Sequence, residues 1–169
     1  MKTVIPKDFL DRINFTKVFR YLAYLAVSLI LQNIIFTQLR IFGVCPLVLP
    51  AVAVAMGMFE GATWGPILSL LLGIFADMAF IENTVFFTLL FPGLSFAAAF
   101  LSNFFINRRF FAFMGAALLG LLATAGAQIL KTSASDSFSL VMIPTAVLQT
   151  LWSLPFAALA FFPPSLMNK

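Results

Sequence analysis

Apolar residues run through the chain in long stretches, separated by short breaks that carry charged or turn-forming residues. Each stretch can cross a ~30 Å hydrocarbon layer as a helix, because about 20 residues suffice at ~1.5 Å per residue. A spanning segment must also satisfy its own backbone hydrogen bonds in lipid, which favours helices. The pattern therefore predicts an all-α integral membrane protein, a single bundle of six transmembrane helices at about 18–36, 42–59, 62–80, 84–105, 110–130 and 140–161.

Prolines make the second stretch the least regular of the six. Pro46 and Pro50 lie in its first half, and proline inside a helix removes a hydrogen bond and kinks the chain. Residues 43–46 are expected to form either part of a kinked helix or a bent entry to a regular helix that begins near Leu47. Kinks are also predicted in the fourth and sixth stretches, at Pro92 and Pro155.

Basic residues are distributed unevenly between the two sides of the predicted bundle. Only Arg40 and Lys131 fall on one side. The other eight of the ten basic residues fall on the side of both termini: Lys2, Lys7, Arg12, Lys17, Arg20, Arg108, Arg109 and Lys169. The positive-inside rule therefore predicts that both termini are cytoplasmic, with tails at 1–17 and 162–169 flanking the membrane domain at 18–161.

Composition narrows the class of protein further. The chain is 62% hydrophobic and 9% charged, whereas soluble domains carry about 25% charged residues. The net charge of +4 comes from residues that flank apolar stretches, so we expect contact with anionic membrane lipid and none with nucleic acid. The first apolar stretch is longer than a signal-peptide core, and no cleavable signal peptide is predicted.

Small or polar residues recur at every fourth position from the end of the second stretch through the third. The series comprises Gly57, Gly61, Gly65, Ser69 and Gly73, and it continues to Asp77. Positions four apart form a ridge on a helix, and small side chains let a neighbouring backbone approach closely. The series therefore predicts either packing within the bundle or a groove that receives a helix of another protein. A weaker series lies in the fifth stretch, at Ala112, Ala116, Gly120, Thr124 and Gln128.

Asp77 is the carboxylate that the pattern places inside the membrane. An ionised aspartate at mid-membrane costs roughly 2.5–3.5 kcal/mol, so Asp77 must face the bundle, find a partner or stay protonated. We expect Arg40 and Lys131 to be its charge partners. The same half of the bundle is predicted to contain a polar cluster: Asp77, Gln32, Asn33, Arg40, Gln128 and Lys131, with Gln38 and Gln149 nearby. This cluster is interpreted either as a structural network or as the lining of an outward-facing cavity.

The remaining candidate chemistry argues against an enzyme. The chain has no His, and Cys45 is its only cysteine, which excludes histidine bases and intrachain disulfides. No cofactor and no metal site is predicted, and no nucleophile–base set is evident. Glu60 precedes Gly61 at a short turn, where an acid suits the first turn of the next helix.

One stretch resembles a known family. It runs from Gln32 through a Gln38-Leu39-Arg40-Ile41-Phe42-Gly43-Val44-Cys45-Pro46 segment, then Glu60-Gly61, Trp64-Gly65 and Gly73-Ile74-Phe75-Ala76-Asp77. This order resembles the rod shape-determining protein MreD family, small multi-pass proteins of the bacterial inner membrane. The resemblance covers about residues 30–80. In the family the acid is commonly followed by a turn that contains glycine, whereas residues 78–84 here contain none.

The resemblance implies a non-enzymatic scaffold or regulator of the cell-elongation complex that builds the lateral peptidoglycan wall. It implies binding to the membrane helix of MreC and, through MreC, links to MreB, RodA and a class B penicillin-binding protein. Under that interpretation the small-residue groove receives the MreC helix. The alternative is a substrate-binding membrane subunit of an energy-coupling-factor-type vitamin transporter, in which the polar cluster would be the solute pocket.

Overall fold

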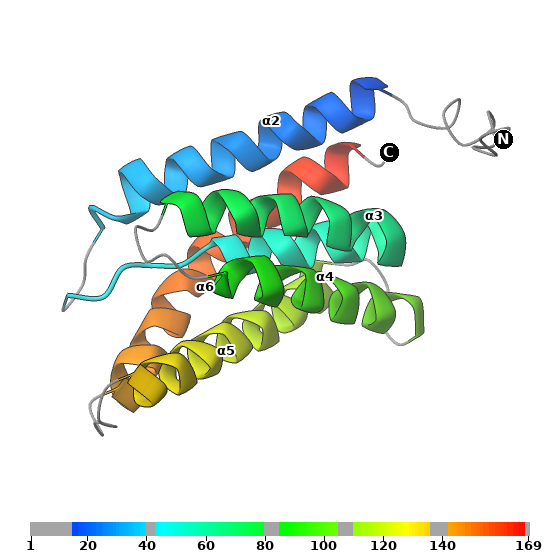
Figure 1. Ribbon diagram of the computed structural model, residues 1–169. Coiled ribbons are helices and arrows are strands. Elements are labelled where there is room, and N and C mark those ends of the chain that lie inside the picture. The colour runs from blue at the N-terminus through cyan, green and yellow to red at the C-terminus, as the bar shows by residue number, and fades with distance from the viewer. Residues whose placement is uncertain (1–14, 40–42, 80–84, 105–109, 136–141, 168–169) are drawn as a thin grey trace, which may run out of the picture.

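The computed structural model describes residues 15–39, 43–79, 85–104, 110–135 and 142–167, and these residues form helices joined by short connections (Figure 1). The described part of the chain contains no β-strand, so the all-α prediction is confirmed. The elements are α2 (Phe15–Leu31), its π-helical continuation η1 (Gln32–Phe36), α3 (Leu49–Ala79), α4 (Phe86–Phe104), α5 (Phe110–Ser135) and α6 (Met142–Met167).

The helices have the length and surface of membrane spans. Among the described residues four helical stretches are long and apolar enough to cross a membrane: Phe19–Phe36, Leu49–Ala79, Phe110–Ser133 and Met142–Pro164. A shorter apolar stretch, Phe86–Ser102, lies in α4. Phe111 is 87% exposed and Leu89 77% exposed, whereas the Ser153 side chain is fully buried. Apolar side chains outside and polar ones inside suit a lipid environment, so this is a multi-pass helical membrane protein.

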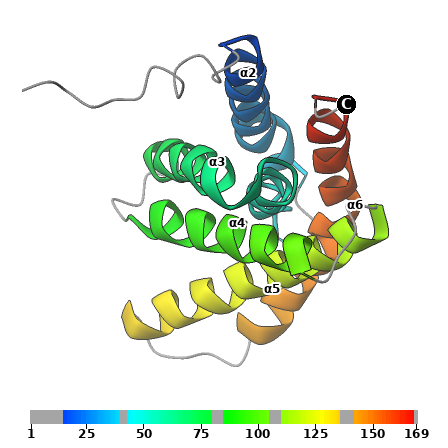
Figure 2. The same cartoon turned by 90° about the vertical axis from the view of Figure 1, so that its right-hand side faces the viewer.

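Helix α3 is not one straight rod, because the chain reverses direction at Gly61. This residue has φ 79° and ψ −172°, a conformation that is open essentially to glycine alone. The reversal divides α3 into a first arm (residues 49–60) and a second arm (residues 62–79), which lie side by side (Figures 1 and 2). The turn falls at the break that the sequence pattern predicts between the second and third apolar stretches.

The first arm of α3 is the centre of the molecule. Residues 49–59 are all buried, and α2, α4, α5 and α6 each pack against α3. Alternation of alanine with valine and methionine gives this arm small, apolar side chains on every face, the composition of a helix enclosed on all sides. Figure 2 shows α4 along one side of the two arms and α2 and α6 on the other, with α5 crossing below.

Residues 43–48 reach the first arm without forming a helix. Pro46 has no N–H to donate, and Pro50 lies in the first turn of α3, where the missing N–H costs nothing. The bent entry predicted as one alternative is therefore present, and the regular helix begins at Leu49 rather than near Leu47. The predicted N-terminal tail comprises residues 1–17, and residues 1–14 of it lie outside the described part of the chain.

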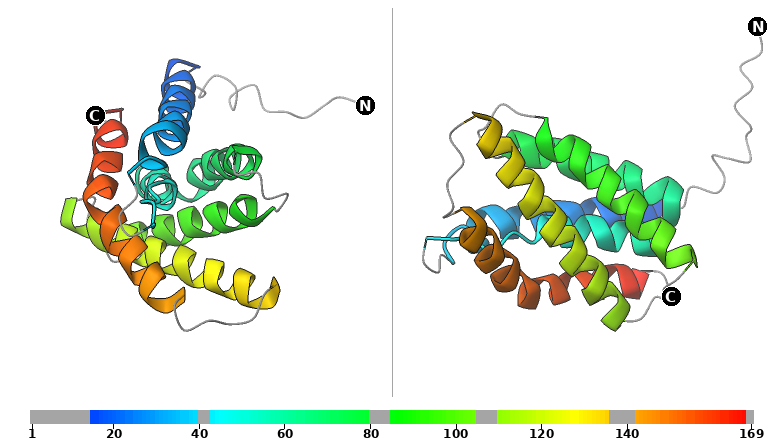
Figure 3. Two further views of the ribbon diagram at one scale, coloured as in Figure 1. Left: turned by 90° about the vertical axis from the view of Figure 1, so that its left-hand side faces the viewer. Right: turned by 90° about the horizontal axis from the view of Figure 1, so that it is seen from below.

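The C-terminal boundary differs from the prediction, since α6 continues to Met167 and does not end near residue 161. Pro163 and Pro164 lie inside α6, and the ring of Pro164 leaves the carbonyl of Ala160 without its helical N–H donor. The Tyr24 hydroxyl donates to that carbonyl over 2.9 Å. A side chain of α2 therefore replaces the bond that proline removes. α6 also bends along its length (Figure 3), as expected for a helix that contains proline.

Candidate functional site

The small-residue series brings the two arms of α3 together. A Cβ atom added to Gly65 would lie 2.7 Å from the Cα atom of Gly57, so the two backbones are in direct contact. The Ser69 hydroxyl donates to the carbonyl of Ala53 at 3.4 Å. Gly57 and Gly65 are each four residues from Gly61, and Ala53 and Ser69 are each eight residues from it. The two arms of α3 therefore form a helical hairpin whose contact follows the ridge of every fourth residue.

The same residues receive α4. A Cβ atom on Gly57 would overlap the backbone carbonyl of Ser95. A Cβ atom on Gly73 would lie 2.6 Å from the carbonyl oxygen of Phe87 and 2.7 Å from the Cα atom of Thr88. The predicted groove is therefore occupied by this chain's own helices. The alternative of packing within the bundle describes these contacts.

The weaker series on α5 also faces the interior. A Cβ atom on Gly120 would lie 2.8 Å from a methyl group of Val54 in the first arm of α3. The buried Thr124 hydroxyl donates to the Gly120 carbonyl over 2.8 Å. Gly120 thus lets α5 approach the first arm, as Gly57 does for α4.

Asp77 caps the start of α4. One carboxylate oxygen accepts a hydrogen bond from the backbone N–H of Phe87 at 3.0 Å. The other accepts from the backbone N–H of Thr88 at 2.8 Å and from its hydroxyl at 2.7 Å. The N–H groups in the first turn of a helix have no partner inside the helix, and a carboxylate beside them is favoured by both hydrogen bonding and the helix dipole.

The described partners of Asp77 are groups of α4, whereas Arg40 and Lys131 were the expected charge partners. Within the described part of the chain, every hydrogen-bond donor to Asp77 belongs to the first turn of α4. The Lys131 ammonium lies 5.4 Å from the centre of the Phe86 ring, where a cation is attracted to the face of an aromatic side chain. Arg40 lies outside the described residues. The first turn of α4 thus provides the hydrogen-bonding partner that a carboxylate inside the membrane needs.

Gln32 fastens the non-helical segment that precedes α3. Its amide nitrogen donates to the carbonyl of Pro46 at 2.9 Å, and its amide oxygen accepts from the N–H of Val48 at 2.9 Å. The N–H of Leu47 donates to the hydroxyl of Ser153 at 2.8 Å. These three bonds satisfy backbone groups that a helix would have satisfied internally, a condition for irregular backbone at membrane depth.

The expected polar cluster is therefore divided between separate contacts. Gln32 is buried against the segment before α3, whereas its neighbour Asn33 is exposed. Asp77 binds the start of α4, and Gln128 lines a cavity beside α5 and α6. The polar atoms of Gln32 and Asp77 thus bind different segments of the chain, and the predicted member Arg40 lies outside the described residues.

The structure contains two side-chain hydrogen bonds that the sequence pattern did not predict. The Tyr21 hydroxyl donates to the Glu60 carboxylate at 2.6 Å, which ties α2 to the turn of α3. The indole N–H of Trp152 donates to the carbonyl of Leu39 at 3.2 Å. Ser153 was also missed, although Gln149 and Ser153 lie four residues apart in an otherwise apolar stretch and hence on one face of α6.

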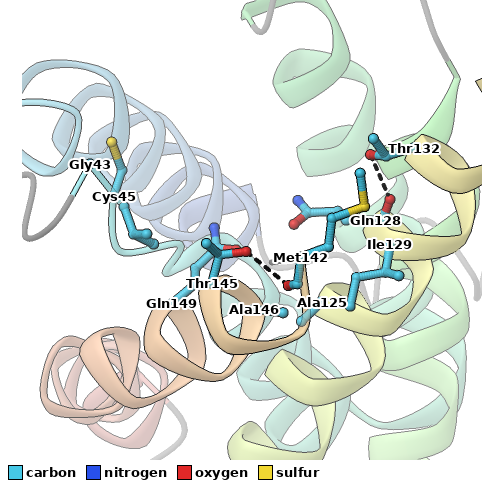
Figure 4. A pocket seen from close by; sticks show the side chains of 11 residues that line it. Gly43, Cys45, Ala125, Gln128, Ile129, Thr132, Met142, Thr145, Ala146 and Gln149 are labelled. Carbon is cyan, nitrogen blue, oxygen red and sulfur yellow. Dashed lines mark hydrogen bonds between the residues drawn. The ribbon is translucent and has the colours of Figure 1, made fainter. Parts of the chain in front are cut away.

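A cavity of about 390 Å³ lies between the non-helical segment and helices α5 and α6 (Figure 4). Gly43, Val44 and Cys45 bound it on one side. The two helices contribute Ala125, Gln128, Ile129, Thr132, Met142, Thr145, Ala146 and Gln149. The polar groups of the lining are amides, hydroxyls and one thiol.

Comparison with known proteins gives no relative from which to read a function. No family model, no curated protein and no solved structure matches the chain. The resemblance to the MreD family is carried only by the residues quoted above.

Proposed function

We propose that the chain crosses the bacterial cytoplasmic membrane six times, with both termini in the cytoplasm. The first arm of α3 provides ~18 Å and the extended residues 43–48 about 20 Å, enough together for a ~30 Å layer. The start of α2, the turn of α3 and the end of α6 lie toward one end of the bundle (Figure 1). That arrangement supports an even number of crossings, and the distribution of Lys and Arg supports the orientation.

We propose further that the protein is an MreD-like, non-enzymatic scaffold of the cell-elongation complex that binds the membrane helix of MreC. The observation that supports this proposal is the set of structural contacts that the motif residues make. Gln32, Glu60, Gly65, Gly73 and Asp77 belong to the stretch that resembles the family. In the fold each of them fixes α3 against α2, α4 or the segment before it.

The chemistry of these motif residues favours a scaffold over a solute-binding role for the same groups. Both carboxylate oxygens of Asp77 accept hydrogen bonds from α4, and both polar atoms of the Gln32 side chain bind backbone groups. Their polar atoms thus stabilise the shape of the molecule. A scaffold binds its partners through a stable surface of this kind. Because α4 occupies the small-residue groove, the MreC helix would dock on the outer faces of the helices.

Affinity purification from the membranes of the source cell tests this function. The full-length tagged protein is expected to recover MreC and, through it, MreB, RodA and a class B penicillin-binding protein, in amounts well above those recovered by an unrelated tagged membrane protein. Absence of MreC from a cross-linked preparation would refute the scaffold role. Recovery of paired ATPases or of a stoichiometric vitamin would instead establish the transporter-subunit alternative, which the 390 Å³ cavity favours.

Reporter fusions test the six-span topology independently. A reporter that is active only in the cytoplasm is expected to be active at both termini and when inserted at the Glu60–Gly61 turn. A reporter that is active only outside is expected to function between α2 and α3. Activity at one terminus only would refute an even number of spans and would leave the pull-down result unaffected.

A further inference from the structure

The cavity beside α5 and α6 exists because residues 43–48 are not helical. An extended segment is thinner than a helix with its side chains, so the space next to Gly43, Val44 and Cys45 is left open toward α5 and α6. Figure 4 shows Cys45 and Gln149 on one side of this space and Gln128 and Thr132 on the other. The cavity volume of about 390 Å³ falls in the range of small-molecule sites.

The hydroxyl groups of the lining are partly used. The Thr132 hydroxyl donates to the carbonyl of Gln128 at 3.0 Å, and the Thr145 hydroxyl donates to the carbonyl of Met142 at 2.8 Å. The Thr132 hydroxyl therefore keeps only its acceptor capacity toward the cavity. The Cys45 thiol lies 3.7 Å from the carbonyl of Thr37, to which it donates.

The two glutamine side chains are different, because their carboxamides keep both functions. In the residues that the structure describes, neither the Gln128 nor the Gln149 side chain makes a hydrogen bond. Both backbone carbonyls are taken, by Thr132 and by Ser153 respectively. Each carboxamide offers two N–H donors and one acceptor oxygen. Both side chains are half-buried, so their carboxamides are within reach of a molecule in the cavity.

We propose that this cavity binds an uncharged ligand that presents an N–H group next to a carbonyl, such as a primary amide, a lactam or a cyclic urea. The carbonyl oxygen of such a ligand can accept from both carboxamides, and each of its N–H groups (one in a lactam, two in a primary amide or a cyclic urea) can donate to one glutamine oxygen. Gln128 on α5 and Gln149 on α6 would bind it from two sides, with Thr132 as an additional acceptor. Asp77 and Gln32 take no part, since their polar atoms bind α4 and the segment before α3.

Cys45 provides a reporter for this site, because it lines the cavity and is the chain's only cysteine. The test measures the rate at which N-ethylmaleimide labels the full-length protein in lipid nanodiscs, by intact mass spectrometry. The probes are benzamide, 2-pyrrolidone and 2-imidazolidinone, one for each ligand type. Methyl benzoate is the matched control, since it has the shape of benzamide but no N–H donor. A Cys45→Ser variant measures background labelling.

At least one probe is expected to slow labelling in a saturable manner, by about tenfold at ten times its half-protecting concentration. Methyl benzoate is expected to leave the rate unchanged. The Gln128→Leu/Gln149→Leu double variant should lose the protection, whereas Asn33→Leu, which removes an exposed amide, should keep it. If the double variant does not purify as a monodisperse species, each single substitution is tested, and each is expected to weaken protection.

Three outcomes would overturn the proposal. Cys45 that does not react in the unliganded protein would show that the cavity is closed to small molecules. If none of the three probes changes the labelling rate of Cys45, the cavity holds water only. Equal protection by benzamide and methyl benzoate, or protection that survives in the double variant, would assign the effect to partition of the probes into lipid.

Discussion

Asp77 holds Thr88 through both donors of that residue, its backbone N–H at 2.8 Å and its hydroxyl at 2.7 Å. The contact joins the end of the second arm of α3 to the first turn of α4. Gly73, one helical turn before Asp77, lies against the backbone of Phe87 and Thr88. Because position 73 has no side chain, α4 approaches closely enough for the carboxylate to reach its N–H groups. The glycine and the aspartate therefore act as one unit.

Loss of this cap is expected to destabilise the α3–α4 contact. Asp77→Ala should lower the free energy of unfolding by about 1–2 kcal/mol, the usual cost of removing a helix cap. Asp77→Asn should cost less, because its amide oxygen still accepts one of the bonds. The measurement is thermal or denaturant unfolding of the purified protein in detergent. Met78→Ala is the control, since the neighbouring Met78 is 76% exposed. Equal stability of Asp77→Ala and the wild type would show that the cap contributes nothing.

Glycine at position 57 is expected to be essential for folding. A Cβ atom there would overlap the carbonyl of Ser95 in α4, and a backbone group cannot turn aside as a side chain can. Gly57→Ala should therefore cost at least about 3 kcal/mol, the upper end of typical overpacking costs. Gly126→Ala in α5 is the matched control, because nothing lies within 4 Å of its added Cβ atom. That variant should be neutral or gain up to about 1 kcal/mol from helix propensity.

These variants separate packing from partner binding. If Gly57→Ala inserts, purifies and unfolds like the wild type, α4 does not occupy the groove, and the groove would again be available to a helix of another protein. The comparison with Gly126→Ala ensures that any loss reflects the position and not the glycine-to-alanine change itself.

Much of the fold could be predicted because lipid restricts the choice. Apolar stretches separated by polar breaks fix where helices lie, and the turn at Gly61 falls at the predicted break. The fourth-position series also predicted close packing. The sequence pattern alone did not show which helix fills that groove. Spacing within one helix describes the face of that helix, and it does not identify which other helix packs against that face.

The sequence pattern also did not predict which of two neighbouring polar residues is buried. Gln32 and Asn33 are adjacent amides in one apolar stretch, and both were placed in one cluster. One is buried with two backbone partners, and the other is exposed. Their difference follows from the rotation of about 100° between neighbouring helical positions and from the irregular backbone that Pro46 imposes opposite. A signal was available, because a proline that breaks a buried segment leaves backbone groups that need a nearby amide.

Gln32 is therefore expected to be more important for stability than its neighbour. Gln32→Leu leaves the carbonyl of Pro46 and the N–H of Val48 without partners, at roughly 1–3 kcal/mol for each group. Gln32→Glu should lie between Leu and the wild type, since a carboxylate accepts from Val48 but, when ionised, donates nothing to Pro46. Asn33→Leu is the control and should have little effect. Unfolding of the three variants in detergent, with hydrogen exchange at Val48, provides the measurement, and equal stability of all three would contradict the assignment.

The reversal at Gly61 is the remaining feature on which the hairpin depends. With φ 79° and ψ −172°, the residue lies where a side chain is strained even though nothing lies within 4 Å of an added Cβ atom. Gly61→Ala should therefore cost about 1–3 kcal/mol through the backbone alone. Gly115→Ala in α5 also adds a Cβ atom into open space, but at a helical position, so it should be neutral or stabilising. Unfolding measurements on the two variants distinguish strain from crowding. A Gly61→Ala protein as stable as Gly115→Ala would mean that the two arms of α3 are not joined by this turn.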